Sequence, residues 1–407
     1  MVEWSFLTGR AGCCGWLGRR CTTKTVRSYC QPQRLDKTSI HRLCETLLEC
    51  RACQELFLSL HFFLPMSHRH YLLNHVRHVT AAARHPGGRA LLLTFDAFST
   101  LFHPRQPVAE QYASTAHSFG LSPSVVTPAK LQTAFKEAFK AQSKRWPNYG
   151  REDVLKGRYG GPREWWGDVI RGSFTRIIKG DAAGDQVGLP EGMVESLLER
   201  FAGREGYALY EDVVPFFERL KRMKTDNGER TFDRIVVGVI SNSDDRVPAV
   251  LKSLGLTVGD VRADQERSSM ELPGFEERSR MDENAKILSS ALYSPSESIE
   301  PVNDIDMVIT SYEAGEEKPH KLIFDVAKRQ AQRFVESMHG KTTESVSAYN
   351  WIFIHVGDDY QKDYRGAIDA GWNSFLLPRE PLGDDVQDAK RIDTLLELIP
   401  KLEGYNG

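Results

Sequence analysis

Hydrophobic and polar positions alternate in two different periods along the part of the chain that follows residue 89. Short continuous apolar runs, typical of strands buried on both faces, lie at 90–95, 235–240, 307–310, 351–356 and 374–377. Segments with a helical period of apolar residues lie between them, at 211–223, 247–254, 320–334 and 364–370. Strands that alternate with helices predict an α/β fold with a doubly wound parallel sheet.

A different pattern covers residues 107–206, where apolar residues recur only at helical spacing. Thr127 followed by Pro128 is typical of a helix start, because the threonine can cap the helix and proline suits its first turn. We therefore expect an all-helical domain at 107–206, inserted into a core formed by 90–106 and 207–407. Trp165 and Trp166 are expected mainly to pack these helices together, with a place in the substrate pocket as the alternative.

Residues 259–306 fit neither period. They hold twelve acidic and five basic residues and are rich in Ser and Pro. Loops longer than about 15 residues are uncommon in compact domains unless they are functional or disordered. We predict a disordered acidic insertion within the core.

Charge is distributed unevenly over the 407 residues. The net charge of −2 combines thirteen Lys/Arg and five Asp/Glu in residues 1–89 with a net charge of −10 in the rest. An acidic body argues against nucleic acid as a partner. All seven cysteines lie at or before Cys53, so the rest of the chain needs no disulfides, which suits an intracellular compartment. No apolar run reaches the ~20 residues of a membrane span.

The leader at 1–89 is basic and cysteine-rich. Residues 56–95 contain no acid and several arginines on an amphipathic pattern, which is the composition of a mitochondrial import sequence. Met66 is a candidate internal start, and an unstructured tail is the alternative. Cys50 and Cys53 lack a second matching pair, so we expect unpaired thiols rather than a zinc site. The expected location is the cytoplasm or nucleus, with mitochondrial import as an alternative.

Polar side chains stand where the predicted strands end. The stretch LLLTFDAFSTLF ends an apolar strand on Asp96, a carboxylate that is costly to bury without a partner. Parallel strands present their carboxyl ends along one edge of the sheet, where α/β proteins bind their ligands. The side chains expected to meet at this edge are Asp96, Ser241, Asn242, Lys318, Asp358 and Asp363.

These residue types suit phosphoryl chemistry. Asp96 can attack an electrophile and form a covalent intermediate. Asp96 and Asp358 can supply two oxygen ligands to Mg²⁺. Ser241 can bind a phosphoryl oxygen, and Lys318 is a compact positive charge that can hold Asp96 and the substrate. Asp363 lies one turn into the next helix, where it can bind Lys318 or the waters of the metal.

The segments FDAFSTLF, GVISNS, GEEKPHKLIF and HVGDDYQKDYRGAIDAGW resemble the four motifs of the haloacid dehalogenase superfamily, in the same order. The resemblance implies a Rossmann-like core, a helical cap between the first two motifs and, in most members, Mg²⁺-dependent phosphatase activity. It implies that Asp96 is the nucleophile, that Ser241 and Lys318 are catalytic, and that Asp358 and Asp363 are metal ligands.

The resemblance also assigns two residues of the first loop. Thr100 occupies the position of a threonine that shapes this loop, and with Asn242 it is predicted to contact substrate. The backbone carbonyl of Phe98 occupies the position of a further metal ligand.

Phe98 is a departure from the family pattern, because phosphatases of this superfamily carry a second Asp there that protonates the leaving oxygen and activates water. General acid–base catalysis contributes about 10²–10⁴-fold. Three hypotheses follow. The first is a hydrolase of a small phosphorylated metabolite, with activity that is weakened or restricted to good leaving groups such as acyl or aryl phosphates. The second is a metal-independent 2-haloacid dehalogenase-like hydrolase, whose leaving halide needs no proton, and the third is a non-catalytic ligand- or protein-binding fold. The acid-rich fourth motif favours the first. Substrate identity and oligomeric state stay open.

Overall fold

The computed structural model describes residues 88–179, 188–225, 230–263, 302–338, 349–381 and 388–405. All of them belong to one compact unit, Arg84–Gly407. The leader predicted at 1–89, apart from Gly88 and Arg89, lies outside the described residues, and so do Cys50, Cys53 and Met66. Among the described helices, none has the length and apolar character needed to cross a membrane.

Six parallel strands form the central sheet, in the order β5-β6-β4-β1-β7-β8. Their bounds are β1 Arg89–Phe95, β4 Arg234–Ser241, β5 Val258–Val261, β6 Ile305–Thr310, β7 Asn350–Gly357 and β8 Asn373–Leu376. β1 lies in the interior of the sheet between β4 and β7, which explains why its sequence is apolar on both faces. The predicted α/β fold with a parallel sheet is confirmed.

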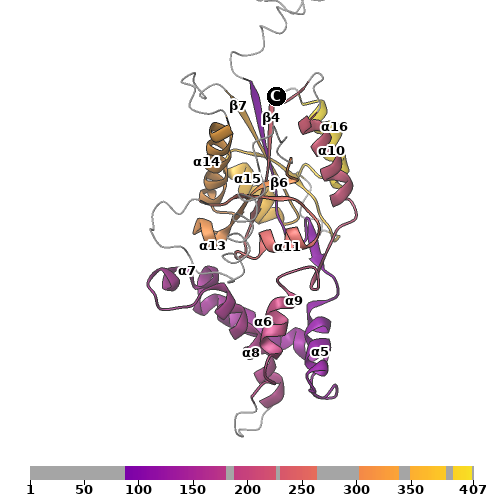
Figure 1. Ribbon diagram of the computed structural model, residues 1–407, viewed down its shortest axis with the longest axis vertical. Coiled ribbons are helices and arrows are strands. Elements are labelled where there is room, and N and C mark those ends of the chain that lie inside the picture. Colours follow the sequence, from indigo (N-terminus) through magenta and orange to yellow (C-terminus); the bar gives the residue numbers. More distant parts are fainter. Residues whose placement is uncertain are drawn as a thin grey trace, which may run out of the picture. The chain divides into compact units, whose positions relative to one another are not determined.

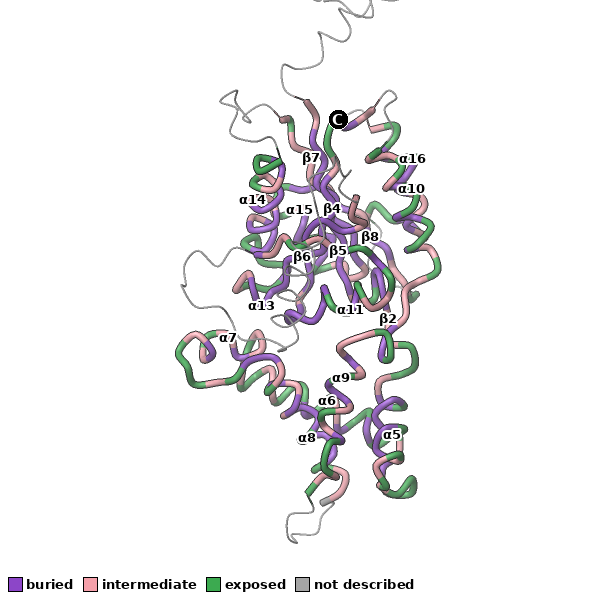
Figure 2. Tube along the Cα trace, viewed as in Figure 1, coloured by how far each residue is buried: buried purple, intermediate pink, exposed green. Residues whose placement is uncertain are grey.

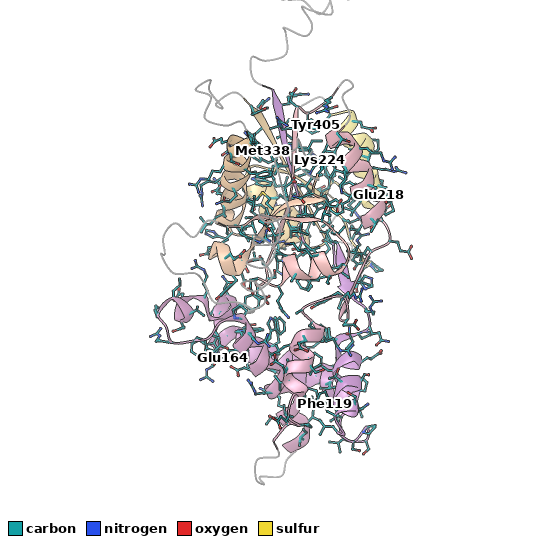
Figure 3. All side chains as sticks on the ribbon, viewed as in Figure 1. Phe119, Glu164, Glu218, Lys224, Met338 and Tyr405 are labelled. Atoms are coloured by element: carbon teal, nitrogen blue, oxygen red, sulfur yellow. The ribbon has the colours of Figure 1, made fainter. Side chains whose placement is uncertain are left out.

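Helices cover both faces of the sheet (Figure 1). One face packs against α10 Val213–Thr225, α11 Val247–Ser253 and α16 Leu398–Glu403, and the other against α14 Lys321–Met338 and α15 Gly366–Asp369. Glu218 on α10 and Met338 on α14 lie on opposite sides of the sheet (Figure 3). Leu91, Leu93 and Phe95 join the first layer, whereas Leu92 joins the second, as the alternation of strand side chains requires.

Five helices form a separate block at the carboxyl end of the sheet (Figure 1). They are α5 Val108–Ser118, α6 Pro128–Arg145, α7 Pro147–Leu155, α8 Pro162–Lys179 and α9 Met193–Arg200. The chain leaves the core through β2 Phe102–Pro104 and returns through β3 Tyr207–Leu209, which pair antiparallel. The side chain of Thr127 caps α6 by accepting a hydrogen bond from the Lys130 amide, as its sequence predicts. Figure 2 shows buried and exposed positions following one another along the helices of the block.

Several elements differ from the expectation. All of β5 but its first residue, and the first two residues of β6, lie within the range 259–306, so both ends of the predicted acidic insertion belong to the sheet. Residues 264–301 lie outside the described residues. The helix expected at 364–370 begins earlier, as a π-helix at Tyr360–Arg365 that runs into α15. Asp359 causes this early start, because its carboxylate accepts the first amides of the turn. A short helix, α13 Ser311–Ala314, also follows β6 directly.

Candidate active site

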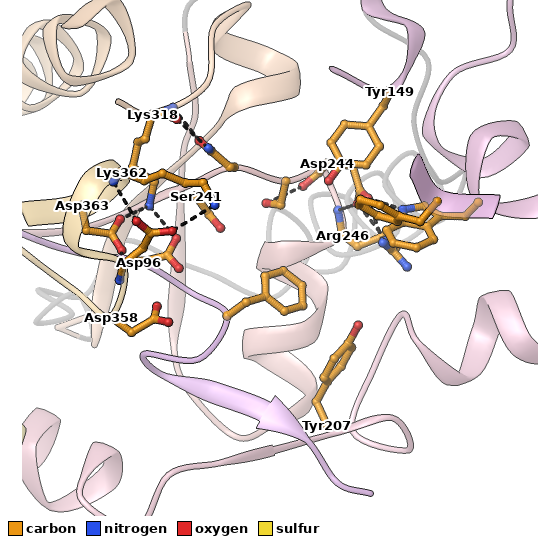
Figure 4. A pocket seen from close by; sticks show the side chains of 16 residues that line it. Asp96, Tyr149, Tyr207, Ser241, Asp244, Arg246, Lys318, Asp358, Lys362 and Asp363 are labelled. Carbon is orange, nitrogen blue, oxygen red and sulfur yellow. Dashed lines mark hydrogen bonds and ion pairs between the residues drawn. The ribbon is translucent and has the colours of Figure 1, made fainter. Parts of the chain in front are cut away.

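A cavity of about 310 Å³ lies where the carboxyl end of the sheet meets the helical block (Figure 4). Seven of the eight residues predicted for the site line it: Asp96, Phe98, Ser241, Asn242, Lys318, Asp358 and Asp363. Thr100 does not. It is fully buried, and its hydroxyl donates a 3.2 Å hydrogen bond to Asp358. Thr100 therefore acts on the site through Asp358 rather than through the predicted substrate contact.

Lys318 is at the centre of the polar side of this cavity. Its ammonium group donates to Asp363 at 2.6 Å, to Asp96 at 2.7 Å and to the backbone carbonyl of Ile240 at 2.7 Å, and its side chain is 2% exposed. Burial alone would lower the pKa of Lys318, but the carboxylates of Asp363 and Asp96 outweigh it and hold this pKa above its usual value. Lys318 is therefore charged, and it fixes one oxygen of Asp96.

Asn242 holds the backbone of Lys318 from both sides. Its side-chain carbonyl accepts from the Lys318 amide at 2.6 Å, and its NH₂ group donates to the Lys318 carbonyl at 2.9 Å. Both ends of its side-chain amide bond the protein, and the residue also lines the cavity. The substrate contact predicted for Asn242 stays a prediction. Ser241 ends β4 beside it, with its side chain at the cavity wall.

Asp363 is held by three donors. Its Oδ1 accepts from Lys318 and lies 3.2 Å from His355 Nε2, and its Oδ2 accepts from the Asp359 amide at 3.0 Å. Burial would raise the pKa of Asp363, but Lys318 and His355 lower it well below its usual value. Gly357 makes this approach possible, because a Cβ at that position would overlap the Asp363 carboxyl group. His355 was not predicted, since a histidine inside an apolar strand gives no local signal of this bond.

The three acids of the site fit a divalent cation. Oxygen atoms of Asp96, Asp358 and Asp363 lie within 4.8 Å of one another. Burial raises the pKa of both Asp96 and Asp358, and the neighbouring carboxylates help to bring that of Asp358 to about 7. This excess of buried negative charge on oxygen ligands is what Mg²⁺ neutralises. Both oxygens of Asp363 already have protein donors, so Asp96 and Asp358 are the better placed pair. The carbonyl of Phe98 stays a prediction as a further ligand.

Aromatic rings form the other side of the cavity. They belong to Phe98, Phe139, Tyr149, Trp166 and Tyr207. The ring of Phe98 packs against Phe102 and Tyr207, with centroids 4.6 and 5.5 Å apart. The two neighbouring tryptophans have different places: Trp165 is buried among the cap helices, as expected, whereas Trp166 reaches the cavity.

A buried ion pair that was not predicted lies beside these rings, and both of its residues line the cavity. Arg246 contacts Asp244 through Nε and Nη2, both at 2.8 Å, and its guanidinium group lies 4.7 Å from the centroid of Trp166. The indole N–H of Trp166 donates to Asp244 at 2.7 Å. Burial opposes ionisation of Asp244, but Arg246 and Trp166 keep its pKa below the usual value. In the sequence these two charges read as a polar loop after β4.

Arg379 supports the loop that carries Asp96, although no pattern in the sequence singles it out. Its Nε and Nη2 donate to the carbonyl of Thr100 at 3.1 and 2.8 Å, and its guanidinium group pairs with Asp212 at 2.8 Å. Thr100 in turn bonds Asp358. Arg379 is therefore positioned to fix both the loop and Asp358, a candidate metal ligand. Arg379 and Thr100 are 279 residues apart in the sequence.

Comparisons with curated proteins find relatives that are less than 30% identical to this chain over more than two thirds of its length. No family model matches the chain. Haloacid dehalogenase-like hydrolase domain-containing protein 3 from Bos taurus and from Homo sapiens are each 28% identical to it over 321 residues, 78% of this chain and 95% of the relative. An uncharacterised protein from Saccharomyces cerevisiae is 26% identical over 300 residues, 72% of this chain and 74% of its own length.

Two solved structures align more weakly. A 2-haloacid dehalogenase from Pseudomonas syringae pv. Tomato DC3000 has 17% identity and a TM-score of 0.40, covering 77% of this chain and 97% of its own. A HAD phosphatase from Thermococcus onnurineus has 17% identity and a TM-score of 0.33, covering 78% and 98%.

Proposed function

We propose that this chain, which belongs to the haloacid dehalogenase superfamily in the group of haloacid dehalogenase-like hydrolase domain-containing protein 3, is a Mg²⁺-dependent hydrolase of small phosphorylated molecules. The observation that carries the proposal is the bonding of Lys318 to both Asp96 and Asp363, beside Asp358, in one cavity. A volume of about 310 Å³ suits a small ligand.

Asp96 is the nucleophile in this proposal. Lys318 holds one of its oxygens at 2.7 Å, which directs the other toward the substrate. That oxygen attacks phosphorus, and the bond from phosphorus to the leaving oxygen breaks with its electron pair on that oxygen. Water then attacks phosphorus, the bond to Asp96 breaks, and the carboxylate, inorganic phosphate and a proton are released.

The other residues bind charge around the reacting group. Magnesium, when bound by Asp96 and Asp358, supplies positive charge beside the phosphoryl oxygens. Ser241 lines the cavity next to Asp96 and is placed to donate its hydroxyl proton to a phosphoryl oxygen. Asp363 keeps Lys318 in position through its 2.6 Å contact.

Phe98 limits the reaction. Its side chain lines the cavity where the phosphatase pattern has an acid, and a phenyl ring cannot donate a proton. The lost general acid–base contribution amounts to about 10²–10⁴-fold for a leaving alkoxide that must be protonated. Substrates with leaving groups that are stable as anions avoid most of this loss.

A second candidate function is metal-independent hydrolysis of a 2-haloacid. The aromatic ring of Phe98 beside Asp96 favours it, because a halide leaves carbon without being protonated. Asp96 would then attack carbon and release halide, and water would hydrolyse the resulting ester. The acids Asp358 and Asp363 near Asp96 favour the phosphatase, since the dehalogenase needs no cation.

The test compares wild type with Asp96→Asn on p-nitrophenyl phosphate and acetyl phosphate, with Mg²⁺ and with EDTA. Asp233→Asn is the matched control, because Asp233 is an exposed acid outside the cavity that bonds the Arg89 amide. We expect Mg²⁺-dependent turnover that Asp96→Asn abolishes and the control retains. Equal rates for wild type and Asp96→Asn would refute the proposal. Chloride release from 2-chloropropionate in EDTA would support the second candidate.

A further inference from the structure

We infer that the phosphorylated substrate is an aryl phosphate, whose flat aromatic group binds against the ring-lined side of the cavity. The inference rests on the proposed function and names the substrate class of the same site. In Figure 4, Asp96, Lys318 and Asp363 lie on one side of the cavity, and Tyr149 and Tyr207 lie on the other. The cavity therefore has a charged end for a phosphoryl group and an aromatic end.

The first observation is the arrangement of the aromatic end. Trp166 packs against Phe139 and Tyr149, with ring centroids 5.9 and 6.3 Å apart, and Phe98 packs against Tyr207 at 5.5 Å. The five rings come from the first loop of the core, from α6 and α8, from the non-helical start of α7 and from β3. Rings fixed in this way offer faces and edges to an aromatic ligand.

The second observation concerns charge. Besides Lys318, two cations line the cavity: Arg246 at the aromatic end and Lys362 on the side of Asp96 (Figure 4). Arg246 is committed to Asp244 by two 2.8 Å contacts, and Lys362 pairs with Asp359 at 3.0 Å at a more exposed position. A second anionic group on the substrate would have to compete with these carboxylates and lose its hydration. A neutral aromatic group would not.

The third observation is the backbone at Tyr149. This residue has φ 60° and ψ 24°, and Asn148 before it has φ 46°, both in the left-handed region that non-glycine residues rarely adopt. Asn148 is held there by two hydrogen bonds to Ser311 in the core, of 2.8 and 3.0 Å. Such conformations persist where the surroundings impose them, and they gather at ligand sites. Here the result is a tyrosine ring at the cavity wall.

The same substrate class fits the loss of the acid at position 98. A phenol has a pKa near 10, so its anion leaves phosphorus far more readily than an alkoxide does. The bond between phosphorus and the aryl oxygen breaks with its electrons on oxygen, Asp96 gains the phosphoryl group, and the aryloxide takes a proton from solvent. The aromatic wall and the missing proton donor therefore point to one kind of substrate.

Binding of phosphonates tests the inference without turnover, because their carbon–phosphorus bond is not cleaved by this chemistry. Isothermal titration of the full chain in Mg²⁺ compares phenylphosphonate, cyclohexylphosphonate and methylphosphonate. We expect phenylphosphonate to bind about tenfold more tightly than methylphosphonate, the upper range for one aromatic contact, and more tightly than cyclohexylphosphonate. Phe139→Leu should reduce this preference several-fold, and Phe139 tolerates change because it is 38% exposed. Phe334→Leu, a half-buried ring on α14 outside the cavity, is the control and should retain it.

Three results would overturn the inference, and they differ in what else they reject. Equal binding of phenyl- and methylphosphonate, or of phenyl- and cyclohexylphosphonate, rejects the aromatic substrate and leaves the proposed function standing. A preference that survives in Phe139→Leu and Trp166→Leu alike rejects the assigned wall. Failure of every phosphonate to bind in Mg²⁺ rejects the proposed function together with the inference.

Discussion

Replacing Lys318 with methionine removes the positive charge that lies between Asp96 and Asp363. The lysine side chain is 2% exposed and makes three contacts of 2.6–2.7 Å. Methionine has nearly the same length and volume, so the substitution leaves little empty space. The expected effect is therefore electrostatic.

The magnitude follows from the burial of the pair. Removing one partner of a buried ion pair costs about 3–5 kcal/mol, because the remaining charge stays desolvated. Here two carboxylates lose their shared donor, and the Ile240 carbonyl loses a hydrogen bond as well. We expect the free energy of unfolding of Lys318→Met to fall by about 3–5 kcal/mol at neutral pH in EDTA.

Urea unfolding followed by circular dichroism measures this loss, and two lysines serve as controls. Lys362→Met removes a partner from an exposed pair, with side chains 54% and 36% exposed, and should cost about 1 kcal/mol or less. Lys224→Met breaks the buried pair with Asp306, so it should destabilise the protein comparably without the loss of Asp96 chemistry. If Lys318→Met lowers the free energy of unfolding by only about 1 kcal/mol or less, as expected for Lys362→Met, the reasoning is refuted.

Three further predictions concern other parts of the site. Arg379→Met releases the Thr100 carbonyl and should weaken Mg²⁺ binding about 10–100-fold, because residues that support a metal ligand usually contribute that much to affinity. Isothermal titration measures this change, and an unchanged affinity would contradict the role of Arg379 as a support of the metal ligand. Burial would raise the pKa of Asp212, but hydrogen bonds from Arg379 and the Leu395 amide lower it. The ionised Asp212 therefore stabilises the folded protein above about pH 4, and this stabilisation is lost as the pH falls through the lowered pKa. The stability difference between wild type and Asp212→Asn should therefore shrink between pH 5 and pH 2, and a constant difference in acid unfolding would count against it. Phe98→Asp should raise turnover of an alkyl phosphate, by at most about 10²–10⁴-fold, and no gain in a phosphate-release assay would mean that Phe98 is not the limiting defect.

Much of the fold was predictable because the strands of a parallel sheet are buried on both faces. The apolar run that ends at Phe95 and the run at 351–356 lie side by side in the structure, as β1 and β7. Their ends fall at one edge, and this alone brings Asp96 and Asp358 to one cavity. Shorter elements were missed, such as β2 and β3, because three residues are too few to show a period.

The supporting residues of the site were not predictable for a different reason. Arg379 and Thr100 are 279 residues apart, so no local pattern links them. His355 lies within a strand, and only the fold shows that its ring meets Asp363. Arg246 and Asp244 have the composition of a solvated loop, yet both are buried, and Arg246 lies over the ring of Trp166 at the cavity wall. Long-range contacts decide each of these roles.

A crystal structure grown with magnesium and beryllium fluoride tests the central claim most directly, because beryllium fluoride mimics a phosphoryl group on an aspartate. We predict the fluoride complex bound to Asp96, one magnesium ion between the carboxylates of Asp96 and Asp358, and Lys318 still bonded to Asp96. Density for the complex elsewhere, or an Asp96 and an Asp358 that share no ion at saturating magnesium, would contradict the account.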